Sequence, residues 1–132
     1  MTRFSLAVAL VTRYLRYWLP VVLWMGLIFV ISSQSKLPFA LSKTVDFVIK
    51  KAGHVTEYSI LAFLLWRAIS QGRGAPAPQS FGGAFGLSLL YAISDEFHQT
   101  FVPGRTGRLT DVGFDALGAL LALALVWRFS RE

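Results

Sequence analysis

The 132-residue chain contains no cysteine, and charged residues make up only 15% of it. Without cysteine there is no disulfide bond, no zinc–thiolate site and no thiol nucleophile. Hydrophobic residues account for 55% of the sequence, more than a soluble domain of this size usually contains. The low charge content and the apolar excess together predict an integral membrane protein.

The few charged residues are mostly basic, with 13 lysines and arginines against 7 acidic residues. A basic excess points to nucleic acid when it forms one stripe or one motif. Here the basic residues are scattered in small groups beside apolar segments, an arrangement typical of membrane topology signals. We therefore expect no nucleic-acid partner, and we expect no cofactor.

Four apolar segments are candidates for membrane-spanning helices, each of which takes roughly 20 residues to cross a bilayer. The chain has room for these four crossings and for no second domain, so residues 1–132 form one transmembrane domain. The sequence thus predicts an all-α fold with four transmembrane helices, at about residues 17–33, 54–70, 81–99 and 111–129.

The connection between the first two spans has an amphipathic pattern of its own. Val45, Val48, Ile49 and Ala52 recur at helical spacing among lysines. This pattern predicts a short, separate amphipathic helix on the membrane surface.

Orientation is predicted from the interface residues. Tryptophan stands beside arginine near residues 16–18, 66–67 and 127–128, as expected for an aromatic and basic belt at one interface. Most acidic residues fall on the opposite side, where they would pair with its cations. We expect a multi-pass protein of the bacterial inner membrane with both termini in the cytoplasm.

Small residues within the spans predict where helices approach each other closely. Glycine lets two helix backbones come together without a side chain between them. The expected close-contact positions are Gly83, Gly86, Gly113 and Gly118.

Alternating helices bring the start of the second span, the end of the third and the start of the fourth to one membrane face. An isolated charge in lipid costs at least roughly 2.5 kcal/mol, so the ionisable residues there should face one another or a wet cavity. We expect one polar cluster made of Lys51, His54, Glu57, Tyr58, Asp95, Glu96, His98, Gln99, Arg105, Asp111 and Asp115. Its acidic excess favours a bound cation, a shared proton or a protonated carboxyl group.

These residues also form spaced motifs, and on them the chain resembles the VanZ-like family, named for an accessory protein of teicoplanin resistance. The resemblance covers about residues 20–125. It implies a four-helix membrane protein of the bacterial envelope, without an established reaction. The motifs are Ser32-Ser33-Gln34, Lys51-x-x-His54-x-x-Glu57-Tyr58, Ser94-Asp95-Glu96-x-His98-Gln99, Pro103-Gly104-Arg105 and Asp111-x-x-x-Asp115-x-x-Gly118.

The first hypothesis for the cluster is a binding site at the outer face for an anionic lipid-linked or cell-wall component, linked to glycopeptide resistance. Lys51 and Arg105 would hold a phosphate or carboxylate group. The membrane bilayer and a phosphate-bearing envelope lipid are then the expected partners. A homo-oligomer is compatible with a bundle of this size. The remaining binding candidates are Tyr58, Glu96, Gln99, Asp111 and Asp115.

Three alternatives stay open. A hydrolase or transferase would use His54 as base, Glu57 to orient it and Asp95 as proton acceptor. A less favoured metal site would combine His54-x-x-Glu57 with Asp95-x-x-His98. A purely structural cluster would pair Lys51 with Glu57 or Asp95, and Arg105 with Asp111 or Asp115.

Overall fold

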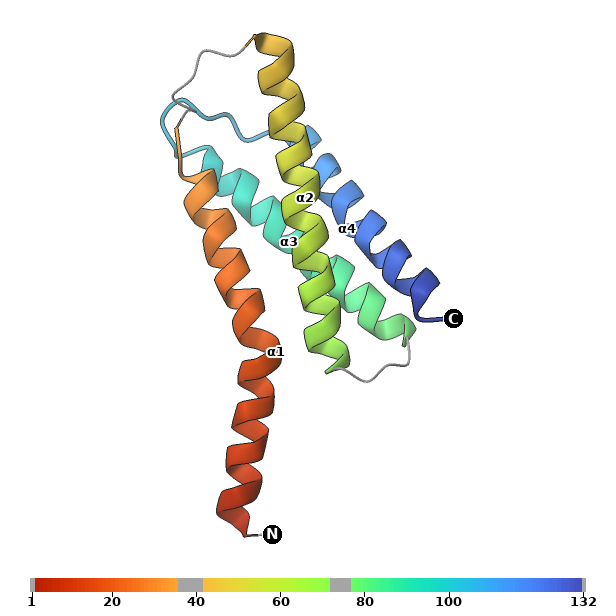
Figure 1. Cartoon of the computed structure of the whole chain (residues 1–132). Coiled ribbons are helices and arrows are strands. Elements are labelled where there is room, and N and C mark those ends of the chain that lie inside the picture. Colours follow the sequence, from red (N-terminus) through yellow and green to blue (C-terminus); the bar gives the residue numbers. More distant parts are fainter. Residues whose placement is uncertain (1, 36–41, 72–76, 132) are drawn as a thin grey trace.

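The structure, a computed structural model, describes residues 2–35, 42–71 and 77–131. It contains four α-helices whose directions alternate along the bundle (Figure 1). The described residues contain no strand, which confirms the predicted all-α class. The helices are α1 (Arg3–Ser32), α2 (Lys43–Ser70), α3 (Pro78–Gln99) and α4 (Leu109–Phe129).

Each of the first three helices starts at a residue suited to that position. The hydroxyls of Thr2 and Ser42 accept hydrogen bonds from backbone N–H groups in the first turns of α1 and α2, which otherwise lack partners. Pro78 opens α3, where its missing N–H costs nothing. The helix starts therefore follow from local sequence.

The predicted separate amphipathic helix is wrong. Residues 45–52 form the first turns of α2, which runs unbroken to Ser70. An ion pair between Lys50 and Asp46, 2.8 Å apart and one turn from each other, supports the continuous helix. Residues 36–41 of the predicted connection lie outside the described part of the chain.

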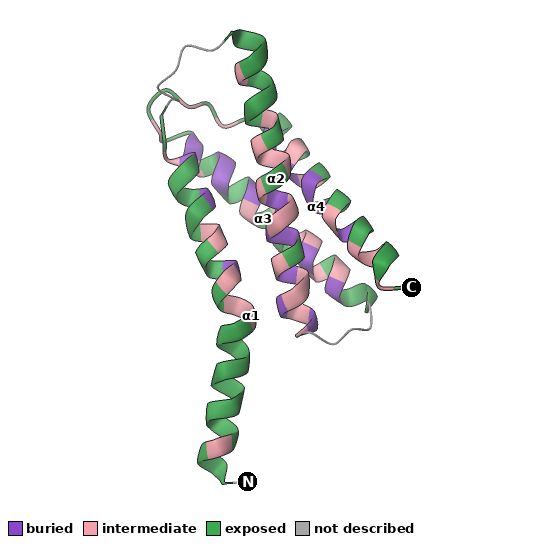
Figure 2. Cartoon of the chain, viewed as in Figure 1, coloured by how far each residue is buried: buried purple, intermediate pink, exposed green. Residues whose placement is uncertain are grey.

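The core lies between α2, α3 and α4. α2 packs most extensively against α4, and α3 packs against both of them. Figure 2 shows the buried residues on the facing sides of these helices. Tyr58, Leu61 and Ala62 of α2 are fully buried there. α2 is therefore the central helix, and its packing against α3 and α4 fixes the positions of the side chains in its first turns.

α1 is peripheral and extends beyond the bundle. It contacts α2 and, lightly, α3. Its first half, up to Arg16, is almost entirely exposed and projects past the other helices (Figures 1 and 2). Two side-chain donors fasten its second half: Trp24 Nε1 donates to the Glu57 carbonyl at 2.9 Å, and the Tyr91 hydroxyl donates to the Met25 carbonyl at 2.6 Å.

Removing either donor is expected to weaken the attachment of α1. Trp24→Phe and Tyr91→Phe should each lower the free energy of unfolding by about 1 kcal/mol, the usual contribution of one hydrogen bond. Denaturation of the purified protein by sodium dodecyl sulfate measures this. Tyr14→Phe is the matched control because Tyr14 lies exposed on the projecting half of α1. An equal effect of all three changes would contradict the assignment.

Close contact between helices is confirmed at two of the four predicted glycines. A Cβ added to Gly118 would overlap the backbone carbonyl of Val55 in α2, and one added to Gly83 would lie 3.2 Å from Ile69 Cδ1. Among the described residues, Gly86 and Gly113 have no such neighbour within 4 Å, so the prediction is wrong for these two. Spacing alone does not tell which side of a helix faces its partner.

Two helices, α1 and α4, are long and apolar enough to cross a membrane among the residues that the structure describes. α2, which contains several lysines, and α3, which is less apolar, are not among them. Their polar residues are concentrated at one end of the bundle.

Candidate functional site

The end of α1, the start of α2, the end of α3 and the start of α4 lie at the same end of the bundle (Figure 1). This confirms the expected convergence of the three motif-bearing helix ends. Six polar side chains are buried near this end, a costly arrangement unless they have partners. They are Ser32, Asp95, Glu96, Gln99, Asp111 and Asp115.

α2 and α4 are joined there by two charged contacts. The Lys51 ammonium forms an ion pair with Asp111 Oδ1. One turn further along α2, His54 Nδ1 lies 2.7 Å from Asp115 Oδ1, and Asp115 is fully buried. Spacings of three residues in α2 and four in α4 put each pair on facing sides. Lys51 therefore pairs with Asp111, and its predicted pairing with Glu57 or Asp95 is wrong.

The Lys51 ammonium is also flanked by aromatic rings. It lies 5.3 Å from the ring centre of Phe47 and 5.4 Å from that of Phe114. Aromatic faces attract cations at such distances. Only 15% of the Lys51 side chain is exposed, so the ion pair with Asp111 is largely shielded from water.

Glu96 brings α3 into the same group. Its Oε2 accepts a hydrogen bond from the backbone N–H of Arg108 at 2.8 Å, which ties the end of α3 to the start of α4. Its Oε1 is buried and has no hydrogen-bond partner among the described residues. Ligand-type atoms of Glu96, His54 and Asp111 all lie within 4.8 Å of one another. We call Lys51, His54, Glu96, Asp111 and Asp115 the central cluster.

Arg105 makes different contacts from those predicted. Its Nε donates to the Gln34 carbonyl at 2.7 Å, and Nη2 donates to the Ile31 carbonyl at 3.1 Å. Ile31 lies in the last turn of α1 and Gln34 just beyond that helix, and the carbonyls at a helix C-terminus carry partial negative charge, which favours a cation. Arg105 thus ties the α3–α4 loop to the end of α1, and its predicted pairing with Asp111 or Asp115 is wrong.

Gln99 links Arg105 to Asp95. The Gln99 amide nitrogen donates to Asp95 Oδ2 at 3.1 Å, and its oxygen accepts from Arg105 Nη1 at 3.4 Å. Both α3 residues are buried. Asp95 is therefore held by an amide, without a lysine or arginine in direct contact among the described residues.

Glu57 and Tyr58, the two predicted site residues that follow His54 in α2, make no side-chain hydrogen bond among the described residues. Glu57 bonds to another helix through its backbone carbonyl, which accepts from Trp24. The Tyr58 side chain is fully buried, and its hydroxyl has no partner in the described part of the chain. Among the described residues, the carboxylate within hydrogen-bond distance of the His54 ring is that of Asp115, so Glu57 does not orient this ring.

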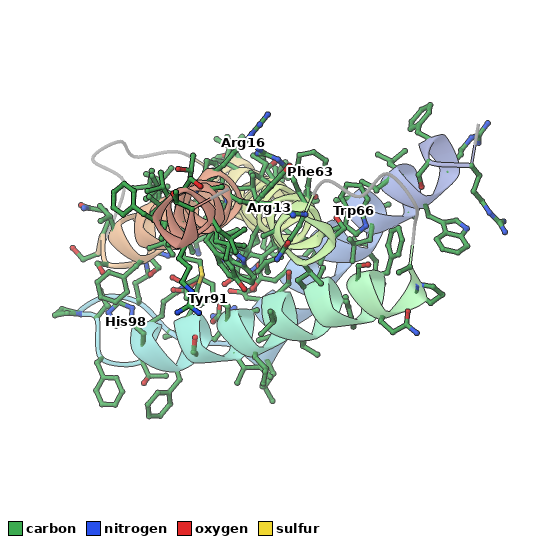
Figure 3. The ribbon with its side chains drawn as sticks, turned by 90° about the horizontal axis from the view of Figure 1, so that it is seen from below. Arg13, Arg16, Phe63, Trp66, Tyr91 and His98 are labelled. Carbon is green, nitrogen blue, oxygen red and sulfur yellow. The ribbon has the colours of Figure 1, made fainter. Side chains whose placement is uncertain are left out.

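His98 lies apart from His54. Its ring stacks on Phe29 of α1, with ring centres 4.5 Å apart, and its Nδ1 lies 3.5 Å from Ser32 Oγ. Figure 3 shows His98 and Tyr91 projecting from α3 toward α1. The predicted metal set of His54, Glu57, Asp95 and His98 is therefore not assembled. A different trio, His54 with Glu96 and Asp111, converges instead.

Comparison with known proteins gives one match. A family model described as VanZ/LLP1 matches residues 17–130, nearly the whole chain. No curated protein and no solved structure matches the chain. The matched segment contains every residue of the central cluster as well as Arg105.

Proposed function

The chain belongs to the VanZ/LLP1 family, and from this premise we propose that it binds an anionic, lipid-linked component of the bacterial envelope at its polar end. In this proposal all four helices cross the inner membrane and the termini are cytoplasmic. The polar end then lies at the outer face, where lipid-linked wall components and glycopeptides such as teicoplanin would meet. A role in resistance belongs to the same proposal.

Exposed apolar side chains support the membrane part of the proposal. Large apolar residues lie on the outer surface of every helix, including Leu23, Phe63, Leu90 and Leu125. A soluble monomer rarely exposes so much contiguous apolar surface. The polar residues of α2 and α3 that lower their hydropathy include Tyr58, Asp95 and Glu96, which are buried inside the bundle. Inward-facing polar groups are what a span can tolerate.

The observation that carries the binding proposal is that two cations at the polar end have donors without a partner among the described residues. A guanidinium has five N–H groups, and the described contacts of Arg105 use three of them. An ammonium has three, and in the described part of the chain Lys51 uses one, on Asp111. Remaining donors on two cations suit the several oxygens of a phosphate or carboxylate group.

We expect Arg105→Gln to weaken binding of a phosphate-bearing lipid at least about tenfold, since a hydrogen bond to a charged group contributes roughly 1.5–3 kcal/mol. Native mass spectrometry of the full chain in detergent, titrated with phosphatidic acid, measures this. Diacylglycerol, which lacks the phosphate, is the ligand control. Arg128→Gln is the matched protein control because Arg128 lies in the last turn of α4, at the opposite end.

Glutamine at position 105 retains donors for the α1 carbonyls, so the variant should stay folded, and gel filtration checks this. If Arg105→Gln and Arg128→Gln bind phosphatidic acid equally well, binding does not occur at the polar end and the proposal fails. Release of inorganic phosphate during the titration would instead assign the site to hydrolysis, with His54 and Asp115 as the base and its orienting carboxylate.

A further inference from the structure

The central cluster contains three atoms that share the geometry of metal ligands. His54, Glu96 and Asp111 come from three different helices, and one ligand-type atom from each lies within 4.8 Å of the other two. His54 Nε2 is 3.9 Å from Asp111 Oδ2. Ligands bound to one zinc ion at about 2.1 Å lie at most about 4.2 Å apart, so a pair at the 4.8 Å limit would have to approach by roughly 0.6 Å or more to share the ion.

In each of the three side chains, one polar atom is held by another residue. Asp115 accepts from His54 Nδ1 at 2.7 Å, which leaves the lone pair on Nε2. The Arg108 N–H binds Glu96 Oε2 at 2.8 Å, and the Lys51 ammonium binds Asp111 Oδ1. Metal sites characteristically fix their ligands by such outer contacts, above all by a carboxylate on the far nitrogen of a histidine.

A second observation points to a missing ligand. Glu96 is 5% exposed, and its Oε1 has no hydrogen-bond partner among the described residues. The same holds for Oδ2 of the fully buried Asp115. Folded proteins leave few buried polar atoms unsatisfied, because each costs roughly 1–3 kcal/mol and more when it is charged. A cation at the cluster would give Glu96 Oε1 the partner it lacks.

The net charge of the central cluster also favours a bound cation. Glu96, Asp111 and Asp115 carry three negative charges when ionised, against one positive charge on Lys51. The central cluster therefore has a net charge of minus two when His54 is neutral. One divalent cation balances it.

We propose that His54, Glu96 and Asp111 bind one divalent transition-metal ion, with Asp115 as the residue that positions His54. One imidazole and two carboxylates suit Zn²⁺ or Mn²⁺. Three protein ligands leave a coordination position open, which is typical of sites that bind water or a further ligand. The inference stands apart from the lipid proposal, because the ion binds without any lipid.

The test is a Zn²⁺ and Mn²⁺ titration of the full chain, purified in detergent through a tag that lacks histidine and stripped with a chelator. We expect one ion per chain by elemental analysis. Glu96→Gln and Asp111→Asn should each abolish stoichiometric binding. Asp115→Asn should weaken it about 10- to 100-fold, as outer-contact substitutions do.

His98→Ala and Glu57→Gln are the matched controls, because both change a histidine or carboxylate outside the trio. Both variants should bind one ion like the unmodified chain. Gel filtration shows which variants fold, and two independent ligand variants keep the test decisive if one does not. The inference is overturned if the folded chain binds neither ion, or if binding survives in the folded ligand variants.

Discussion

Gly118→Ala is expected to lower the free energy of unfolding by about 2–3 kcal/mol, the upper part of the range for overpacking a filled core. The added Cβ would overlap the Val55 carbonyl. This carbonyl belongs to a helix backbone, which cannot change conformation to avoid the overlap as a flexible side chain can. α2 and α4 would have to separate at the contact that also holds Ser59 Oγ on the Gly118 carbonyl at 2.8 Å. Denaturation by sodium dodecyl sulfate measures the change.

Gly113→Ala is the matched control on the same helix. In the part of the chain that the structure describes, no atom outside the local helix lies within 4 Å of a Cβ at Gly113. Alanine is also the better helix former by up to about 1 kcal/mol, so this change should leave the protein unaffected or slightly more stable. Similar losses at both positions would show that helix α4 does not approach α2 as described.

Lys51→Met is expected to destabilise the protein by roughly 3 kcal/mol or more, because it leaves the buried Asp111 carboxylate without its cation. Only 15% of the Lys51 side chain and 11% of the Asp111 side chain are exposed. Methionine keeps most of the apolar volume, so the loss reports on charge and not on a cavity. The same denaturation experiment measures it.

The neighbouring lysine provides a control of equal chemistry. Lys50 also pairs with an aspartate, Asp46, but 54% of its side chain is exposed. Lys50→Met should change stability by less than about 0.5 kcal/mol, as exposed pairs on a helix do. Adding Asp111→Asn to Lys51→Met should restore part of the lost stability, since it removes the unpaired charge. Equal effects at positions 50 and 51 would refute a shielded Lys51–Asp111 pair.

Much of the fold follows from the sequence, because the length of an apolar segment is set by its side chains and the alternation of helix direction by the connections between the segments. The predicted ends of the four spans agree with the ends of α1 to α4 to within one residue. The meeting of residues 51–58, 95–99 and 105–115 follows from alternation alone. The starts of α1 and α2 lie earlier than the predicted spans, because a helix continues through polar residues that a hydropathy criterion excludes.

Partner choice within the polar end could not be predicted in the same way. Spacing assigns Lys51 and His54 to one side of α2, but the rotation of that helix decides whether they meet acids of α3 or of α4. Arg105 binds the backbone carbonyls of Ile31 and Gln34, at and just after the end of α1. Every residue has a backbone carbonyl, so no sequence motif predicts these contacts. Glu96 was expected as a ligand-binding residue, yet its proximity to His54 and Asp111 depends on the angle between three helices.

The contacts between α2 and α4 can form only late in the synthesis of the protein. Lys51 and His54 precede their partners Asp111 and Asp115 by 60 and 61 residues. At roughly 5–20 residues per second, α2 leaves the ribosome several seconds before the acids that neutralise it exist. During that interval its polar first turns have no α4 to face. Packing of these first turns must therefore wait for α4, so the second half of the chain completes the fold of the first.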